Sequence, residues 1–192
     1  SDLSKVAAEL GLPLIVKPPH EGSSIGITTV NEASAFQAAY DIAAGLDDSV
    51  LAEEFIKGRE FTVAILGKGA SARALPPIEI VAPQGNYDYQ NKYFTDDTQY
   101  FCPPQLDPAI VAEMERIAVA AYRALGCEGW GRVDVLMRAA DSKLFLLEVN
   151  TSPGMTGHSL VPMAARAVGI SYEDLCLEIV AGARLKMHKG QH

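Results

Sequence analysis

The chain has 192 residues, of which 48% are hydrophobic and 21% charged, a composition typical of a folded globular protein. Its formal net charge of −8 argues against a nucleic-acid partner, and no apolar run reaches the about 18–20 residues of a membrane span or resembles a signal peptide. Three cysteines without CxxC spacing favour reduced thiols in the cytoplasm over a disulfide or zinc framework.

The first part of the chain is predicted to contain two helices and three strands. Apolar periodicity and the positions of Gly and Pro predict helices over 1–12 and 31–44 and strands over 14–17, 26–30 and 50–56. Gly11 is the expected stop of the first helix, and Asn31 is the expected cap of the second.

The second part mixes strands and helices without strict βαβ alternation. We expect strands over 60–66, 71–75, 78–81, 131–138 and 144–149, and helices over 107–125, 159–168 and 171–188. Regular structure is expected to stop over 82–105, a length that is typical of a lid or a binding loop. This order of elements favours the α+β fold class.

The segments 131–138 and 144–149 are the most informative pair, and we expect them to form a hairpin centred on Asp141. In that register Asp134 faces Glu148 and Arg132 faces Asn150, all on one face, because side chains alternate along a strand. The apolar residues then lie on the other face, in the core, and they are Val133, Val135, Leu147 and Val149.

The face with Asp134 and Glu148 is a candidate metal site. Two carboxylates and the amide oxygen of Asn150 are hard oxygen ligands suited to Mg²⁺ or Mn²⁺. Facing carboxylates repel each other unless a cation lies near them. Arg132 is the alternative source of this charge, as an ion pair across the strands. The pattern therefore leaves a metal site and an ion pair open, and we favour the metal.

Two loops and two lysines are candidates for anion binding. Segment 151–159 is rich in Gly, Ser and Thr and leads into a helix, so its backbone N–H groups can bind an anion, although many such segments are only loops. The polar loop 21–24 can cover phosphates, and Lys17 ends a strand beside it, where a solvated lysine is the alternative. The aromatic-rich segment 82–105 is interpreted as a lid that carries Lys92 toward an anion.

Six motifs occur in order over nearly the whole chain. They are LPLIVKP followed by EGSS, then EFTVAIL, YDY-x2-KY, TQYFCP, GWGRVDV and LEVNTSPGMT-x-HSLVPMAA. Together they resemble the D-alanine–D-alanine ligase family of the ATP-grasp superfamily. The resemblance implies an ATP-grasp fold with two α+β lobes and nucleotide bound between them. A truncated central subdomain would cover residues 1–55, and a C-terminal subdomain with an ω-loop at 82–105 would cover residues 56–192.

The reaction that the resemblance implies joins two D-alanines at the expense of ATP for peptidoglycan synthesis. The carboxylate of the first D-alanine attacks the γ-phosphate to give an acyl phosphate, and the amine of the second then displaces phosphate. The implied nucleotide contacts are Lys17 and the loop Glu21, Gly22, Ser23 and Ser24 at the phosphates, Glu53 at the adenine amino group, the Phe55 and Ile56 backbone along the adenine, and Glu60 at the ribose.

The resemblance also implies the metal ligands, the catalytic groups and the substrate contacts. Asp134 and Glu148 would hold one Mg²⁺ or Mn²⁺ ion, and Glu148 with Asn150 a second. Lys92 would reach the γ-phosphate, and Tyr93 would fasten the closed ω-loop. The remaining assignments are Arg132 and the Gly154 backbone at the oxyanion, Ser159 and the Leu160 backbone at the second D-alanine, and Ser23 at the first.

Compared with the family, we expect this chain to lack the first of three domains and the start of the second. We therefore expect it to fold but to turn over poorly or not at all. A D-alanine–D-lactate-type or other ATP-grasp carboxylate ligase is one alternative function, and a non-catalytic nucleotide-binding fragment is another. The resemblance implies a homodimer for the full-length protein, and we expect no nucleic-acid or membrane partner.

Overall fold

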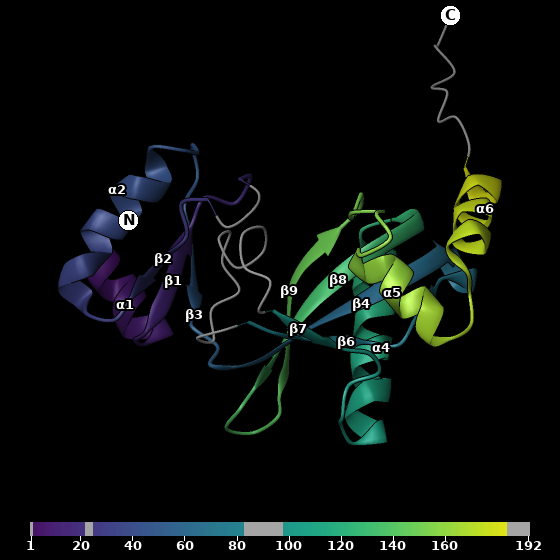
Figure 1. Ribbon diagram of the computed structural model, residues 1–192. Helices are drawn as coiled ribbons and strands as arrows, with labels where there is room; N and C mark the ends of the chain where they lie inside the picture. Colours follow the sequence, from purple (N-terminus) through teal and green to yellow (C-terminus); the bar gives the residue numbers. More distant parts are fainter. Residues whose placement is uncertain (1, 22–24, 83–97, 184–192) are drawn as a thin grey trace, which may run out of the picture. The chain divides into compact units, whose positions relative to one another are not determined.

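A computed structural model describes residues 2–21, 25–82 and 98–183, and the chain forms two compact units. Among the described residues, unit 1 consists of the chain up to Lys57 together with Ala82 and Thr98, and unit 2 consists of Gly58–Val81 and the chain from Gln99 onward (Figure 1). None of the helices in the described ranges has both the length and the apolar character needed to cross a membrane. Each unit has its own antiparallel sheet and its own helices, and each has its own buried core.

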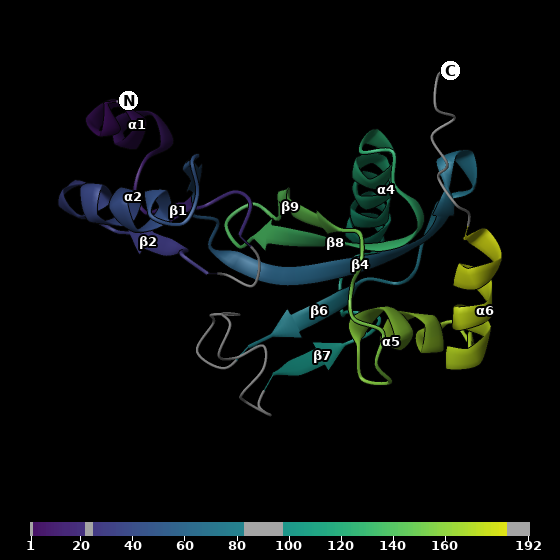
Figure 2. The same cartoon turned by 90° about the horizontal axis from the view of Figure 1, so that it is seen from above.

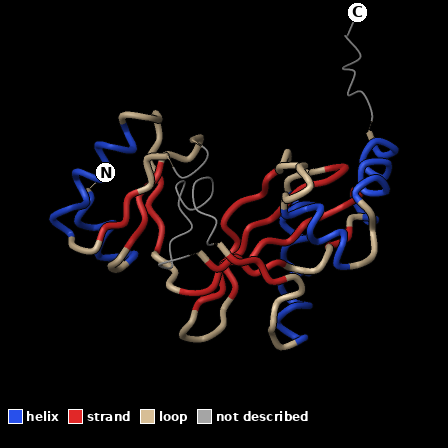
Figure 3. Tube along the Cα trace, viewed as in Figure 1, coloured by secondary structure: helices blue, strands red, loops and turns tan. Residues whose placement is uncertain are grey.

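Unit 1 is a three-stranded antiparallel sheet with two helices (Figure 3). The strand order is β2-β1-β3, and the elements are α1 (Leu3–Leu10), β1 (Leu14–Lys17), β2 (Thr28–Val30), α2 (Phe36–Ala44) and β3 (Leu51–Glu54). Asp2 caps α1 by accepting a hydrogen bond from the backbone N–H of Ser4. A small buried core joins the sheet to the helices, and its members include Leu14, Val16, Val30, Phe36, Ala39 and Ala43.

The second helix of unit 1 begins later than predicted. A short 3₁₀ turn, Ala33–Ala35, precedes α2, and Glu32 rather than Asn31 stands at its N-terminal boundary without a side-chain cap. The α-helix itself begins at Phe36 and again has no side-chain cap. The predicted Asn31 cap is therefore wrong, because the turn separates Asn31 from the first α-helical residue.

Unit 2 is built on a larger antiparallel sheet whose main strand order is β7-β6-β4-β8-β9, with β5 also paired to β4. The strands are β4 (Gly58–Lys68), β5 (Arg73–Ala74), β6 (Ile78–Val81), β7 (Gln99–Phe101), β8 (Glu128–Arg138) and β9 (Leu144–Asn150). Strand β7 pairs with β6 inside the range where regular structure was expected to stop, so that expectation is wrong for residues 99–101. Residues 83–97 of the expected ω-loop lie outside the described residues.

Three helices pack against this sheet on its two sides. Helix α4 (Pro108–Ala124) lies on one face, whereas α5 (Leu160–Ala167) and α6 (Tyr172–Gly182) lie on the other side of β4 (Figure 2). Asp107 caps α4 by accepting a hydrogen bond from the N–H of Ala109, in agreement with the predicted start of that helix at residue 107. Helix α6 ends at Gly182, and residues 184–188 of the predicted helix lie outside the described residues.

The long strands β4 and β8 separate an apolar face from a polar one. Phe61, Val63, Val133 and Val135 pack with Met114, Ala118 and Tyr122 of α4 in the main core. Because side chains alternate along a strand, the intervening residues point to the opposite face. Cross-strand pairing there brings Thr62 opposite Asp134 and Ala64 opposite Arg132. The sheet thus places the predicted metal ligands on the face away from α4.

Candidate functional site

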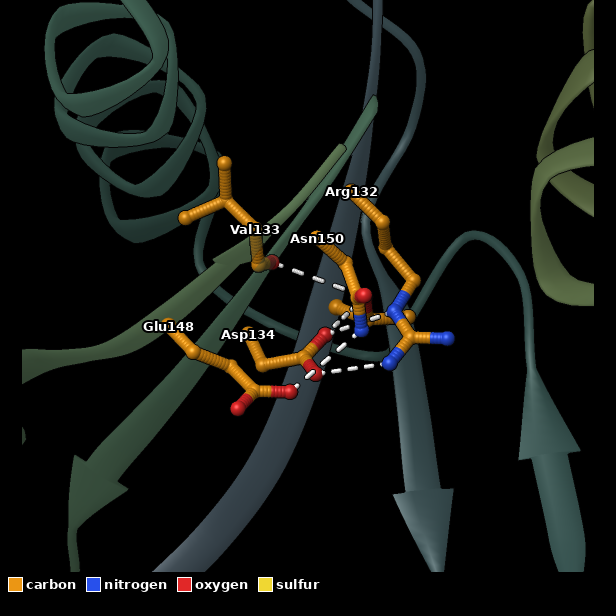
Figure 4. Close-up of polar contacts among 6 residues, drawn as sticks. Arg132, Val133, Asp134, Glu148 and Asn150 are labelled. Atoms are coloured by element: carbon orange, nitrogen blue, oxygen red, sulfur yellow. Dashed lines mark hydrogen bonds and ion pairs between the residues drawn. The ribbon is translucent and has the colours of Figure 1, made fainter. Parts of the chain in front are cut away.

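The β8–β9 hairpin has the predicted register at its functional end. Arg132 is paired with Asn150, and Asp134 with Glu148. The four side chains therefore share one face of the sheet, and Figure 4 shows them pointing toward one another. Val133 and Val149 pair on the opposite face and belong to the core, as expected.

Toward the turn, the register differs from the prediction by one residue. A β-bulge follows Asp134, so Val135 pairs with Leu146 and the hairpin is not centred on Asp141. Leu147 is the extra residue and is 38% exposed, so its predicted place in the core is wrong. Ser142 in the turn adopts a positive φ of 57°. The turn is shifted by one residue from its predicted place, and the extra residue of the bulge compensates for that shift. Asp134 therefore still pairs with Glu148, as predicted.

Arg132 and Asp134 form a bidentate ion pair on this face. The Nε of Arg132 donates to Oδ1 of Asp134 and its Nη2 to Oδ2, each at 2.8 Å. The two side chains are only 11% and 10% exposed. The ion pair that the sequence left open is therefore present, but it joins residues i and i+2 of one strand rather than residues of two strands.

Thr62 is a member of the cluster that the sequence analysis did not identify. Its side chain is buried, and its hydroxyl donates to Oδ1 of Asp134 at 2.6 Å. The alternation of Phe61, Val63 and Ile65 already put Thr62 on the opposite, polar face of its strand. Its partner could not be found in this way, because the β4–β8 pairing joins segments about seventy residues apart.

Glu148 and Asn150 complete the acidic face. The Nδ2 of Asn150 donates to Oε1 of Glu148 at 3.3 Å, so the amide is held beside the carboxylate. Within the described ranges no three His, Cys, Asp or Glu side chains gather as a metal cluster, so the candidate set is two carboxylates and one amide. The two facing carboxylates carry more negative charge than the single guanidinium of Arg132 neutralises. Their oxygens are hard ligands, so the face fits a divalent cation such as Mg²⁺ or Mn²⁺.

The loop after β9 brings two predicted substrate residues together. A Cβ at Gly154 would lie 3.0 Å from Oγ of Ser159, so only a residue without a side chain fits there without displacing Ser159. The same Oγ accepts from the backbone N–H of Thr156 at 2.9 Å. Tyr172 on α6 donates to the carbonyl of Met155 at 2.5 Å, which fastens the loop to a helix. Leu160 begins α5 directly after Ser159 and is buried.

The nucleotide-binding candidates of unit 1 lie on neighbouring strands. Nζ of Lys17 on β1 is 2.5 Å from a carboxylate oxygen of Glu53 on β3, which pairs with β1. Phe55, just after β3, donates its N–H to the carbonyl of Pro13 and is half-buried with its neighbour Ile56. Lys17 is thus paired with an acid rather than simply solvated.

The predicted phosphate loop begins at Glu21, which is exposed, whereas Gly22, Ser23 and Ser24 lie outside the described residues. Just before it, Oδ2 of Asp47 accepts from both the backbone N–H and Nδ1 of His20, at 2.9 and 2.8 Å. The N–H of Ser49 is the main cause that lowers the pKa of Asp47 below its ordinary value; burial opposes this shift, and the contacts with His20 lower the pKa further.

The remaining predicted residues fall into two groups. Glu60 lies on β4, two residues before Thr62, and therefore on the same face of the unit 2 sheet as Asp134. Lys92 and Tyr93 lie outside the described residues. Unit 2 thus assembles Glu60, Arg132, Asp134, Glu148 and Asn150 on one sheet face, while Lys17, Glu53, Phe55 and Ile56 belong to unit 1.

Two solved structures with this architecture are D-Ala ligases. The VanG D-Ala:D-Ser ligase from Enterococcus faecalis is 33% identical with a TM-score of 0.82, and the match covers 93% of this chain and 52% of that structure. The D-alanine–D-alanine ligase from Bacillus anthracis is 32% identical with a TM-score of 0.78, covering 95% of this chain and 57% of that one. The two α+β units with antiparallel sheets therefore have the ATP-grasp fold of these ligases.

Comparison with related sequences shows the family to which the chain belongs. The family described as D-ala D-ala ligase C-terminus matches residues 1–181, and the chain belongs to this family. The D-alanine–D-alanine ligase of Cupriavidus necator is 62% identical over 192 residues, and that of Bordetella avium is 61% identical over 187 residues. These matches cover 100% and 97% of this chain but 58% and 59% of the relatives, so the chain spans less than two thirds of their length.

Proposed function

We propose that this chain carries the metal-binding and much of the nucleotide-binding part of an ATP-dependent ligase that joins two D-alanines for peptidoglycan synthesis. The carrying observation is the face on which Asp134 lies opposite Glu148, with Arg132 and Asn150 beside them. Membership in the family and a relative 62% identical that is named D-alanine–D-alanine ligase support the same reaction.

The first step of the proposed reaction joins the carboxylate of one D-alanine to the γ-phosphorus of ATP, and ADP leaves. In the second step the amine of another D-alanine attacks the carbonyl carbon of the acyl phosphate, phosphate leaves and the amine gives up its proton. Crowded phosphate oxygens and a developing oxyanion both need positive charge or N–H donors, which this cluster and the loop after it can supply.

Mg²⁺ or Mn²⁺ fits the donor atoms of the acidic face. We propose that Asp134 and Glu148 hold one ion and that Glu148 and Asn150 hold a second, in agreement with the facing carboxylates and the adjacent amide. When bound, the ions supply charge neutralisation to the phosphates. The residues of the chain contribute the fixed orientation of their oxygens, since Asp134 is held by bonds from two strands.

The substrate contacts follow from the same face and from the loop after β9. Arg132 and the backbone N–H of Gly154 would stabilise the oxyanion, and Ser159 with the N–H of Leu160 would bind the carboxylate of the second D-alanine. The close approach of Gly154 to Ser159 supports this grouping. Ser23 would orient the first D-alanine, a role that rests on the resemblance alone.

Nucleotide contacts are proposed in both units. Lys17 would contact the phosphates under the loop of Glu21, Gly22, Ser23 and Ser24, and the ion pair of Lys17 with Glu53 supports a shared role for these two side chains. The other proposed contacts are Glu53 with the adenine amino group, the Phe55 and Ile56 backbone with the ring, Glu60 with the ribose, and Lys92 and Tyr93 with the γ-phosphate and the closed ω-loop.

The most specific part of this proposal is the identity of the second substrate. The curated relatives are D-alanine–D-alanine ligases, whereas one solved structure at 33% identity is a D-Ala:D-Ser ligase. We favour D-alanine because of the higher identity. Product analysis of the full-length protein with D-alanine, D-serine and D-lactate separates the three outcomes. A homodimeric, cytoplasmic enzyme without nucleic-acid or membrane partners is also proposed, on the resemblance and the net charge of −8.

A thermal shift of this chain with ATP, with and without Mg²⁺, tests the proposal. A ligand that binds only the folded state raises the unfolding midpoint, and at 100 times its Kd it adds about 2.7 kcal/mol. For a chain of this length that corresponds to a rise of about 5–10 °C. We expect a rise that requires Mg²⁺. No rise with either addition would contradict the proposed nucleotide and metal binding.

Two matched variants assign the shift to the acidic face. Asp134→Asn removes the carboxylate at the proposed metal site while keeping its shape. Asp141→Asn removes a carboxylate at the turn of the same hairpin, where Asp141 pairs with Arg138. We expect the Mg²⁺-dependent shift to be lost in Asp134→Asn and kept in Asp141→Asn. Unchanged nucleotide affinity in Asp134→Asn would instead favour a non-catalytic nucleotide-binding fragment.

A further inference from the structure

Thr62 stands out because its hydroxyl is buried and has one short bond. The residue is 1% exposed, and Oγ1 lies 2.6 Å from Oδ1 of Asp134. The carbonyl of Val133 is 3.5 Å away, a much weaker contact. An ionised carboxylate can only accept, so the hydroxyl donates to Asp134. A valine would have nearly the same shape at this position, so the hydroxyl is the feature that needs a function.

The carboxylate of Asp134 is held from two strands at once. Oδ1 accepts from Thr62 on β4 and from Nε of Arg132 on β8, whereas Oδ2 accepts from Nη2 of Arg132. A carboxylate has about four acceptor sites, so these bonds leave one on Oδ2. The side chain is thus fixed in one orientation with acceptor capacity remaining on a defined oxygen.

The two donors differ in whether their hydrogen bonds to Asp134 can persist during the proposed reaction. Arg132 is the residue proposed above to stabilise an oxyanion, and a guanidinium that turns to the reacting group gives up bonds to Asp134. Thr62 has no such second role, and its short β-branched side chain is buried in the pairing of β4 with β8. The bond from Thr62 is therefore the one that can hold Asp134 in place while Arg132 moves.

We propose that Thr62 is a positioning residue for the reaction, one that orients Asp134 as a metal ligand through its hydroxyl. This inference rests on the proposed function, because it requires that Asp134 bind Mg²⁺ or Mn²⁺. Hydrogen bonds to metal-ligating groups commonly change metal affinity by about 10–100-fold when they are removed. The role of Thr62 belongs to its hydroxyl and not to its methyl group.

Mn²⁺ binding by this chain tests the inference without relying on turnover. Free Mn²⁺ is titrated by electron paramagnetic resonance in the presence of ATP, for the unmodified chain and for Thr62→Val and Thr62→Ser. We expect Thr62→Val to lower the Mn²⁺ affinity about 10–100-fold and to change the spectrum of the bound ion. Thr62→Ser keeps the hydroxyl, so its affinity should stay within about threefold of the unmodified chain.

The outcomes separate this inference from the function on which it rests. If the unmodified chain binds Mn²⁺ and Thr62→Val binds it equally well, Thr62 does not position the ligand and the proposed function is unaffected. Equal losses in Thr62→Val and Thr62→Ser would also overturn the inference, because the serine variant keeps the hydroxyl and should then bind Mn²⁺ better than the valine variant. If the unmodified chain binds no Mn²⁺, the proposed metal site fails and the inference with it. Circular dichroism checks folding, and Thr62→Ala replaces the valine variant if that one does not fold.

Discussion

The two units each hold a basic side chain against an acidic one at a proposed ligand contact, but the two ion pairs are not alike. In unit 1, Lys17 and Glu53 are 22% and 40% exposed and come from neighbouring strands. In unit 2, Arg132 and Asp134 are 11% and 10% exposed, and Asp134 has the further bond from Thr62. One pair is reached by water, and the other lies within the sheet face.

This difference in burial predicts different consequences of removing one partner. An exposed pair contributes little to stability, because water solvates whichever charge remains. A buried pair leaves an uncompensated charge behind, and that charge is strongly unfavourable in the interior. Changes at Lys17 and Glu53 should therefore affect ligand binding with little effect on folding, whereas changes at Asp134 should affect both.

The largest expected effect is that of Asp134→Ala. It leaves the Arg132 guanidinium and the Thr62 hydroxyl buried without their main acceptor, which should cost about 3–5 kcal/mol of unfolding free energy. Urea denaturation followed by circular dichroism measures the loss. Replacing both partners, as Arg132→Met with Asp134→Leu, should recover much of it, because apolar side chains of similar size carry no such penalty.

Asp141→Ala is the matched control for that loss. Asp141 also forms a bidentate pair with an arginine of the same hairpin, but Arg138 and Asp141 are 26% and 48% exposed. Its removal should cost far less unfolding free energy than that of Asp134, because water solvates the Arg138 guanidinium that remains. A similar loss in the two alanine variants would mean that burial does not distinguish these pairs.

The sequence predicted the local part of this site better than the non-local part. Arg132, Asp134, Glu148 and Asn150 lie on two strands joined by a short turn, so alternation and one assumed centre were enough to place them on one face. The assumed centre was wrong, and the agreement at the acidic residues depends on the bulge after Asp134. No strand periodicity predicts a bulge of one residue, which is why Leu147 was assigned to the core.

Pairings between distant segments could not be obtained from the sequence. The contact of Thr62 with Asp134 depends on the register of β4 against β8, and the ion pair of Lys17 with Glu53 depends on that of β1 against β3. Single strands show which face a residue occupies but not which residue lies opposite. The role of Glu53 came from the family resemblance, and that of Lys17 from the resemblance together with its position beside the polar loop; both stay predictions.

A smaller effect on stability is expected at the exposed pair. Lys17→Met and Glu53→Gln should each change the unfolding free energy by about 1 kcal/mol or less. Both should nevertheless weaken ATP binding by about tenfold or more. Lys17→Met loses a proposed charged contact with the phosphates, and Glu53→Gln weakens a proposed hydrogen bond to the adenine amino group. Urea denaturation and the ATP-dependent thermal shift measure the two quantities on the same samples. A loss of stability as large as that of Asp134→Ala would contradict the comparison.

The smallest expected effect is the pH dependence contributed by Asp47 in unit 1. Hydrogen bonds from Ser49 and His20 lower its pKa in the folded chain below the ordinary value of about 4, so folding favours the ionised carboxylate. The stabilisation is therefore complete above about pH 4 and is lost as the pH falls through the lowered pKa. Comparing the unmodified chain with Asp47→Asn by urea denaturation between pH 6 and pH 3 measures it. The stability difference between the two should shrink toward acid pH, and a difference that grew there would show that the pKa of Asp47 is raised instead.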